Sequence, residues 1–410
     1  MYYTSKVAYV YNGSEKGSVT MVKAFYRETW AEINADAILY NVQEVKKLLK
    51  PDQKLMAVVK ANAYGHGDVE VADLALQAGA NMLAVAFLDE AISLRQKGVK
   101  APILVLGAVP SLYVKEAIKW NVTITAYSKQ WIEEVIADQA NNGRLTIHLK
   151  IDTGMGRLGL RSDDEIKAVA TLLKSQSFME VEGVFTHFAT ADELNSIYFQ
   201  NQYHRFQSVV QLIQSLGINP PLVHCANSAA IFQQPENLFT AARLGISMYG
   251  LSPSPEMKEI ISVPLKEAFS LHSTLVHVKK VEPGSGISYG ITYESEKAEW
   301  IGTVPIGYAD GWIRKLHNFT ILVKGKKVPV VGRICMDQLM VRLPEQYPVG
   351  TKVTLIGKQG NEQISIDQVA QHLETINYEV PCMISARVPR VIVKNQEQVN
   401  ITNYLLNEHN

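Results

Sequence analysis

Short apolar runs alternate with segments of helical period from residue 55 to residue 246, and each apolar run reads as a strand. Strands are predicted at 55–60, 82–87, 102–107, 122–127, 145–151, 181–187, 222–225 and 241–246. Helices are predicted at 35–49, 69–79, 88–98, 111–119, 129–139, 163–174 and about 195–215. Eight such units have the size and repeat of a (β/α)8 TIM-type barrel, which the count favours over a doubly wound open sheet.

The hydrophobic pattern changes after about residue 265. Alternating runs with turn residues between them occupy 273–281, 300–307, 320–325, 327–332, 352–357 and 386–393, with one helix near 366–374. The pattern predicts an α/β + β protein with a barrel domain at 21–264 and a mostly-β domain at 265–410. The first twenty residues follow neither pattern and lack the apolar block of a secretory signal, so we interpret residues 1–20 as a loosely ordered tail.

Composition narrows the function classes. Forty Lys and Arg balance forty Asp and Glu, so no net charge attracts the chain to nucleic acid or to a membrane surface. No apolar run approaches the ~18 residues of a membrane span. Cys225, Cys335 and Cys382 are far apart and odd in number, which argues against a disulfide framework and a structural zinc site. We expect no metal and a cytoplasmic location.

Polar residues collect where the predicted barrel strands end, which is where parallel barrels place their chemistry. Lys60 is the clearest case, because an apolar strand delivers it into a turn that contains Asn and Gly. A buried lysine loses its proton more readily, as Schiff-base chemistry requires. The alternative is a lysine whose stem reaches along the strand end to solvent. The other strand-end candidates are Lys150, Arg157, His187, Asn227, Ser228, Arg243 and Gly245.

A phosphate site is predicted in the last two loops of the barrel, where barrels frequently bind phosphate. Asn227 and Ser228 follow the seventh strand and Gly245 lies in the eighth. The sequence Asn-Ser-Ala-Ala is also an ordinary helix N-cap, and that alternative stays open. A phosphate site combined with a strand-end lysine suggests pyridoxal 5'-phosphate, which needs both.

Nine sequence strings, in order, resemble those of bacterial alanine racemases, and the match covers about residues 22–405. They are VVKANAYGHG, LKIDTGMGRLG, THFATADE, HCANSAA, RLGISMYGLSP, GISYGITY, PIGYADGW, GRICMDQLM and INYEV. The resemblance covers both predicted domains. It implies a pyridoxal-phosphate-dependent isomerase that interconverts L-alanine and D-alanine.

The resemblance implies two catalytic bases, because inverting a stereocentre requires proton transfer on both faces. Lys60 would bind the cofactor covalently and act on D-alanine, and Tyr289 would act on L-alanine. His187 and Arg243 would form a network behind Tyr289, joined through His224, and Arg243 would face the pyridine nitrogen and keep it unprotonated. The alternatives are purely structural roles: Tyr289 as a turn tyrosine packed on a hairpin, and Arg243 as a member of an ion pair.

The remaining site residues also come from the resemblance. Arg157 and the backbone N–H of Met336 would hold the substrate carboxylate. A carbamate on Lys150 would orient Arg157, and the alternative is a salt bridge from Lys150 to Asp152 or Asp337. The cofactor phosphate would be surrounded by Tyr64, Ser228, Gly245, Ile246 and Tyr378, and the access path lined by Tyr308, Arg314 and Arg333, with Tyr289 and Tyr378 at its narrowest part.

The resemblance finally implies a homodimer that pairs head to tail, in which each active site uses one barrel and the partner's β domain. Tyr289, Tyr308, Met336 and Tyr378 would be the residues supplied by the β domain. The narrow access path favours alanine, with serine or a broader substrate range as an alternative. A pyridoxal-phosphate decarboxylase and a non-catalytic carrier of the cofactor are the rival functions. D-alanine for cell-wall peptidoglycan is the expected biological product.

Overall fold

The computed structural model describes residues 25–138 and 143–406, and its first unit is a closed parallel barrel. Its eight strands are paired in sequence order, and the last strand pairs with the first. They are β2 (Lys54–Val58), β3 (Met82–Val85), β4 (Ile103–Ala108), β5 (Thr123–Ala126), β6 (Leu145–Lys150), β7 (Met179–Phe185), β8 (Leu222–His224) and β9 (Ala241–Leu244). The predicted (β/α)8 barrel and all eight of its strands are confirmed.

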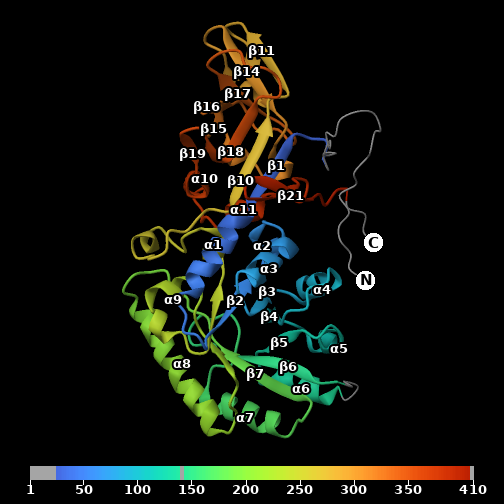
Figure 1. The fold of residues 1–410 in the computed structure, drawn as a ribbon, viewed down its shortest axis with the longest axis vertical. Helices are drawn as coiled ribbons and strands as arrows, with labels where there is room; N and C mark the ends of the chain where they lie inside the picture. Colours follow the sequence, from blue (N-terminus) through green and yellow to red (C-terminus); the bar gives the residue numbers. More distant parts are fainter. Residues whose placement is uncertain (1–24, 139–142, 407–410) are drawn as a thin grey trace.

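Helices cover the outside of the barrel (Figure 1). They are α1 (Ala35–Lys46), α3 (Asp68–Gln77), α4 (Leu88–Gln96), α5 (Val114–Lys119), α6 (Lys129–Ala137), α7 (Asp163–Lys174), α8 (Ile197–Ser215) and α9 (Ser228–Gln233). Ser128, Ser162 and Ser196 start α6, α7 and α8, because each side chain accepts a hydrogen bond from the backbone N–H three residues later. Each helix buries one apolar face, which in α7 consists of Ile166, Val169, Ala170 and Leu173.

The second unit is mostly β, as predicted, and is built on an eleven-stranded sheet. Its strand order is β11-β14-β17-β16-β15-β18-β10-β1-β20-β21, and β19 pairs with β18. The strands are β1 (Thr29–Asn34), β10 (Phe269–Thr274), β11 (His277–Val281), β14 (Glu299–Val304), β15 (Thr320–Val323), β16 (Lys326–Val331), β17 (Leu339–Leu343), β18 (Lys352–Gln359), β19 (Glu362–Ile364), β20 (Arg390–Lys394) and β21 (Glu397–Thr402). A separate hairpin, β12 (Gly286–Ile287) with β13 (Tyr293–Glu294), and two helices, α10 (Ile366–Leu373) and α11 (Glu379–Met383), complete it.

The N-terminal border between the two units differs from the prediction. The sequence assigns residues 21–264 to the barrel domain, but β1 lies between β10 and β20 in the sheet of the second unit. Its alternating pattern buries Ala31 and Ile33 in that sheet, and Asn34 then caps α1 at once. A six-residue strand carries no local signal of which sheet it joins, so pattern alone misplaces it. The predicted tail, residues 1–20, lies outside the described residues.

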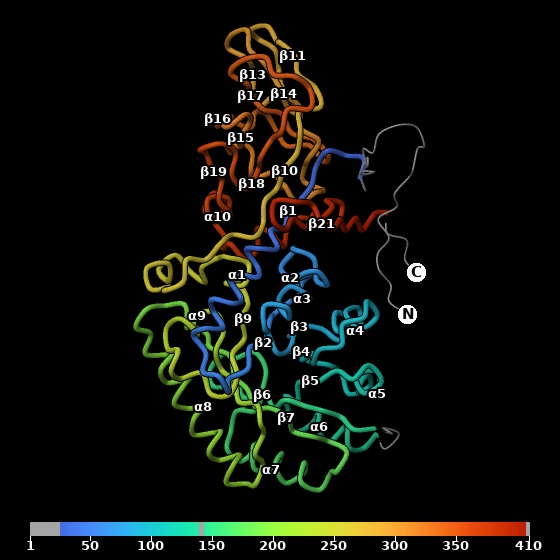
Figure 2. Tube along the Cα trace, in the orientation of Figure 1, coloured from blue at the N-terminus to red at the C-terminus, as the bar shows by residue number. Residues whose placement is uncertain are grey.

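The two units lie end to end, with α1, α2 (Lys60–Tyr64) and α11 near their junction (Figure 1). Both views place β11, β14 and β17 at the end of the second unit that is farthest from the barrel, and Figure 2 adds β13 to this group. Within residues 25–138 and 143–406, no helix is both long and apolar enough to cross a bilayer.

Candidate active site

Lys60 follows the end of β2 and begins α2, a turn of unusual handedness. Ala61, Asn62, Ala63 and Tyr64 all have positive φ, between 51° and 53°, and the turn closes through Ala63 N–H to Val59 O at 2.9 Å. Left-handed backbone costs a residue with a side chain roughly 1–2 kcal/mol, so four in succession need support from their surroundings. Glu90 supplies part of it, because its carboxylate accepts the Ala61 N–H at 2.6 Å.

The turn opens onto a cavity of about 430 Å³ at the carboxyl ends of the barrel strands. Most of the residues predicted from strand ends or from the resemblance line this one cavity: Lys60, Tyr64, Lys150, Arg157, His187, Asn227, Ser228, Arg243, Gly245, Ile246 and Tyr378. The sequence analysis did not identify the further lining residues Val58, Ala61, Leu106, Phe185, Glu379 and Cys382. Apolar strand residues such as Leu106 and Phe185 give no sequence signal that separates them from ordinary core.

Arg243 is almost fully buried and is the centre of a polar network. Its guanidinium donates to Nδ1 of His224 at 2.7 Å and to Nδ1 of His187 at 3.2 Å. It also donates to the backbone oxygens of Thr186 and Cys225, both at 2.9 Å. None of its partners in the described part of the chain is a carboxylate, so the ion-pair alternative is wrong. Burial lowers the pKa of Arg243 to about 10, and because this value is still well above 7, the side chain is charged at neutral pH.

The network continues from His224 to residues that the sequence analysis missed. His224 and His148 share a hydrogen bond of 2.9 Å, and Nε2 of His148 lies 3.1 Å from Glu182. Because arginine can only donate, it fixes His224 as a donor to His148, which in turn donates to Glu182. Burial lowers the pKa of both histidines, so both rings are neutral. Burial and Arg243 likewise hold the pKa of His187 well below its usual range.

Two lysines of the cavity have amines that lose their protons easily. Burial lowers the pKa of Lys60, helped by the neighbouring charge of Arg157. Burial and then Arg243 lower the pKa of Lys150 to about 7. The Lys150 amine donates to Ile151 O at 2.9 Å, while its suggested partners pair elsewhere: Asp152 with Arg161 and Asp337 with Arg387. The salt-bridge alternative for Lys150 is therefore not observed.

The predicted phosphate loops form a cradle beside Lys60. The Ser228 hydroxyl oxygen accepts the Gly245 N–H at 2.9 Å, which leaves the hydroxyl proton free to donate. Glycine at position 245 keeps the cradle open, because a Cβ there would lie in tight contact with the Tyr64 hydroxyl, at 3.0 Å. Burial raises the pKa of Tyr64 and Tyr378, so both phenols remain donors. Asn227 instead caps α9, accepting the Ala230 N–H at 3.0 Å, so its side chain does what the N-cap alternative predicted.

Tyr378 differs from the other residues predicted on the β domain. The sequence analysis groups it with residues supplied by a partner, but in the structure it lines the cavity of its own chain, with its ring 6.2 Å from the Tyr64 ring. Its position next to α11 explains this, because α11 lies at the junction with the barrel (Figure 1). Domain membership in the sequence does not reveal which end of the domain a residue occupies.

The other β-domain residues lie away from the cavity and are exposed. Tyr289 begins η5 (Tyr289–Ile291), between β12 and β13. Its side chain is 71% exposed, so it is not a turn tyrosine packed on the hairpin. Met336 is 52% exposed and Tyr308 is 39% exposed. Arg314 and Arg333 are also exposed, and Arg333 lies beside Gly290, the neighbour of Tyr289. None of these five lines the barrel cavity of its own chain.

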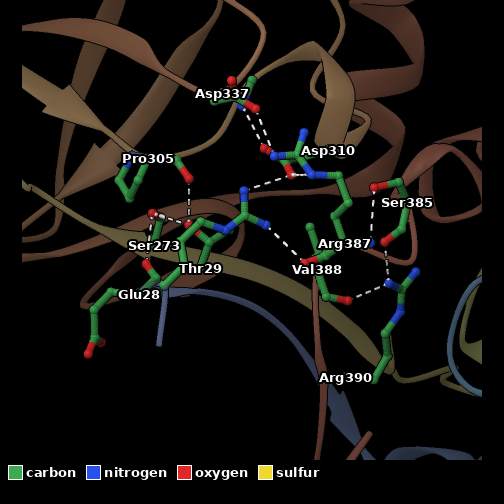
Figure 3. A network of polar contacts seen from close by, with 12 residues as sticks. Glu28, Thr29, Ser273, Pro305, Asp310, Asp337, Ser385, Arg387, Val388 and Arg390 are labelled. Carbon is green, nitrogen blue, oxygen red and sulfur yellow. Dashed lines mark hydrogen bonds and ion pairs between the residues drawn. The ribbon is translucent and has the colours of Figure 1, made fainter. Parts of the chain in front are cut away.

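Ion pairs hold the segments that carry Tyr308 and Met336 (Figure 3). Asp310 is fully buried and pairs with Arg27 at 2.7 Å, and Arg387 pairs with Asp337 at 2.7 Å. The Ala309 N–H donates to Met336 O at 3.0 Å. These contacts fix both segments on the sheet although the side chains of Tyr308 and Met336 point to solvent.

Comparison with known proteins identifies the family. A model of the N-terminal domain of alanine racemase matches residues 33–253, and a model of the C-terminal domain of alanine racemase matches residues 268–392. The chain belongs to the alanine racemase family. Alanine racemase from Geobacillus stearothermophilus is 56% identical over 379 residues, which cover 92% of this chain and 97% of that protein. Alanine racemase 1 from Bacillus subtilis is 55% identical over 384 residues, which cover 94% and 98%.

Solved structures agree with this family assignment. Alanine racemase from Bacillus anthracis, determined with bound L-Ala-P, is 48% identical and superposes with a TM-score of 0.90 over 93% of this chain and 99% of that one. Histidine racemase from Leuconostoc mesenteroides is 33% identical with a TM-score of 0.83, over 90% and 99%. The fold is therefore shared by racemases of different amino acids, and the substrate is determined by the site. The cofactor of the alanine racemase family is pyridoxal 5'-phosphate.

Proposed function

We propose that this protein is an alanine racemase that interconverts L-alanine and D-alanine with pyridoxal 5'-phosphate and two bases. One observation carries the proposal: a single cavity brings together a lysine with a lowered pKa, a phosphate cradle and an arginine that pairs with no carboxylate among the described residues. Family membership supports alanine as the substrate. Serine remains an alternative substrate for the same site, because it differs from alanine by one hydroxyl.

The cavity fits the cofactor in its residues and its volume. Lys60 would hold the cofactor covalently, and the cradle of Tyr64, Ser228 and Gly245, with Ile246 and Tyr378, would hold its phosphate. The space that a Cβ at Gly245 would fill, and the hydroxyls of Tyr64 and Tyr378, which have no hydrogen bond to any described residue, support this assignment. When bound, the cofactor withdraws electrons from the substrate and acidifies its α-proton.

Arg243 favours proton transfer over other reactions at the same site. Its guanidinium, held by His224 and His187, would face the ring nitrogen of the cofactor as a permanent donor. A donor that cannot give up its proton keeps that nitrogen unprotonated and limits electron withdrawal to what proton exchange requires. Pyridoxal-phosphate decarboxylases usually place a carboxylate there, and the absence of one beside Arg243 in the described residues counts against a decarboxylase.

The two proton carriers would stand on opposite faces of the substrate. Lys60, whose pKa is lowered by burial, would remove or return the proton of D-alanine. Tyr289 of the partner subunit would do so for L-alanine, and the charges of Arg243 and Arg157 near it would favour its phenolate form. Arg157 and the backbone N–H of Met336 would hold the substrate carboxylate, and a carbamate on Lys150 would orient Arg157. The Lys150 pKa of about 7 supports this, because carbamate formation needs the free amine.

The proposed enzyme is a homodimer with shared active sites. Tyr289, Tyr308 and Met336 are exposed and none of them lines the cavity of its own chain, so one chain carries both sets of residues without joining them. A head-to-tail pair would bring the exposed half of each chain onto the cavity of the other. Arg314 and Arg333 would then line the access path, with Tyr289 and Tyr378 narrowing it against larger substrates.

We also propose a cytoplasmic location and a role in supplying D-alanine for peptidoglycan. The three cysteines are free, which suits a reducing compartment.

The direct test of the reaction is the optical rotation of L-alanine incubated with the holoenzyme. We expect the rotation to decay to zero without gas release. Carbon dioxide evolution would show a decarboxylase, and unchanged rotation would show a non-catalytic carrier of the cofactor. Faster turnover of L-serine than of L-alanine would make serine the substrate.

A further inference from the structure

The left-handed turn that presents Lys60 is held by side chains, and some of them come from the second unit of the same chain. Within the barrel unit, Glu90 accepts the Ala61 N–H, and Nδ1 of buried His66 pairs with Tyr64 O at 2.9 Å. These contacts restrain two points of the turn. The rest of its support comes from residues more than three hundred positions later in the sequence.

Arg390, at the start of β20, provides the most buried of these contacts. It is 1% exposed, and its Nε donates to Gly65 O at 2.9 Å. Its other nitrogens donate to the backbone oxygens of Ile384, Ser385 and Val388, each at 2.6 Å. Figure 3 shows the contacts of Arg390 with Ser385 and Val388. Because all four acceptors are backbone carbonyls, the guanidinium joins the end of the turn to the segment that follows α11.

The turn and α11 also pack in direct contact. A Cβ at Gly65 would lie 2.1 Å from Pro381 O, so glycine is needed for this close approach as well as for its φ of +81°. Tyr378 and Cys382, at the two ends of this stretch, line the same cavity as the turn. Arg390 therefore holds together two segments that both line the cavity.

Tyr404, near the end of the described chain, makes a second long-range contact. Its hydroxyl donates to Oδ1 of Asn62 at 2.9 Å, and the same oxygen accepts the Asp68 N–H at 2.9 Å. Burial raises the pKa of Tyr404 to about 12, so the phenol is a donor at neutral pH. Asn62 is the middle of the left-handed stretch, and its side chain is thus fixed from both sides.

We propose that Arg390 and Tyr404 are positioning residues that hold the Lys60 turn in its left-handed form, so that Lys60 and Tyr64 face the cofactor. This proposal rests on the proposed function. Neither residue lines the cavity. They would affect the reaction only through the backbone conformation of residues 60–67, so the test measures hydrogen exchange in that segment.

The test compares Arg390→Gln and Tyr404→Phe with a matched control, Arg95→Gln. Arg95 also donates to four backbone carbonyls, those of Val99, Ala101, Trp120 and Asn121, but these precede β4 and β5 at the end of the barrel opposite the cavity. Hydrogen exchange of the holoenzyme is followed by mass spectrometry in the peptide that spans 60–67. Cofactor retention is measured by dialysis, and Lys60 attachment by borohydride reduction and peptide mapping.

We expect Arg390→Gln to speed exchange in 60–67 and to weaken cofactor retention by about 10- to 100-fold, as lost charged hydrogen bonds do. Tyr404→Phe should weaken it about 2- to 10-fold. In both variants, the main effect on racemisation should be a lower kcat, with a smaller change in the KM for alanine. Arg390→Lys should restore part of the loss. Arg95→Gln should leave the 60–67 exchange and cofactor retention unchanged.

Exchange and retention in Arg390→Gln equal to those of Arg95→Gln would overturn the proposal. If Arg390→Gln does not fold, Tyr404→Phe decides, because it removes one oxygen atom and leaves the ring in place. Wild-type exchange and retention in Tyr404→Phe would then overturn it. The proposed function has its own test: it would be wrong if the wild-type holoenzyme did not racemise alanine.

Discussion

The barrel rim and the surface of the β domain differ in how they hold the residues assigned to the proposed reaction. On the rim, Lys60, Arg243 and His187 line one cavity, and buried hydrogen bonds join Arg243 to His187 and His224. On the β domain, Tyr289 and Met336 are more than half exposed. The first group is organised within the chain, and the second lies on its surface.

This difference shows how the site controls its chemistry. The buried half fixes charge states, because Arg243 orders the protons of two histidines and burial lowers the pKa of Lys60 and Lys150. In the proposed dimer, the exposed residues would supply a phenol and a backbone N–H, whose environment would be set by association. A monomer would therefore hold the cofactor but lack the second base.

Removing Lys60 should give the largest effect on the buried half. Lys60→Ala should lower kcat/KM for alanine by more than ~10⁴-fold, because it removes both the cofactor attachment and one base. Borohydride reduction of wild-type holoenzyme should label Lys60, and the variant should take no label. Lys54→Ala changes an exposed lysine at the start of β2, the strand before Lys60; it is the control and should behave as wild type. A label on any other lysine would place the cofactor elsewhere.

Tyr289→Phe is the corresponding change in the exposed half. The loss of one positioned base should slow racemisation ~10²- to 10⁴-fold in both directions, while cofactor attachment stays intact. Solvent deuterium should still exchange into D-alanine, whose proton Lys60 handles, faster than into L-alanine. Tyr293→Phe is the control, since Tyr293 lies on the same hairpin as Tyr289 and its hydroxyl donates to Glu299 of β14. If Tyr289→Phe racemises both enantiomers at the wild-type rate, the two-base account is wrong.

Lys150→Ala tests whether a carbamate orients Arg157. We expect kcat/KM to fall up to about 10²-fold, the typical result of misplacing a substrate-binding group. Small carboxylates such as acetate should restore part of the loss by standing in for the carbamate. In the wild type, carbamylation should decrease as pH falls below about 7, because the Lys150 amine becomes protonated there. Absence of rescue, together with no added mass on Lys150, would remove the carbamate from the account.

Acid should destabilise the protein through its buried neutral histidines. Burial lowers the pKa of His66 to about 4 and that of His272 to about 3. The unfolded state then binds more protons below about pH 6.5, so the free energy of unfolding should fall as pH drops from 6.5 towards 4, by roughly 1.4 kcal/mol per pH unit for each such histidine. Urea unfolding across this range measures the slope. His66→Asn should reduce it, and exposed His204→Gln should not.

The sequence predicted the barrel because each strand and helix carries its own hydrophobic period. It misplaced β1, whose partners β10 and β20 are more than two hundred residues away. It predicted Lys60 and Gly245 from their positions at strand ends. It missed Phe185, because an apolar strand residue looks like core, and it missed the pairing of His148 with Glu182, because the pairing of two strands brings them together. It missed the handedness of the turn after Lys60, because Ala61 and Ala63 give no sign of positive φ.

The central claim is that each active site joins the barrel of one chain to Tyr289 of the other, and mixed dimers test it most directly. Lys60→Ala chains and Tyr289→Phe chains are each nearly inactive, and they are unfolded and refolded together with cofactor in equal amounts. In a head-to-tail pair, half of the dimers are mixed and each has one intact site, so we expect about a quarter of the wild-type activity to return. If each site used residues of one chain alone, mixing would restore no activity.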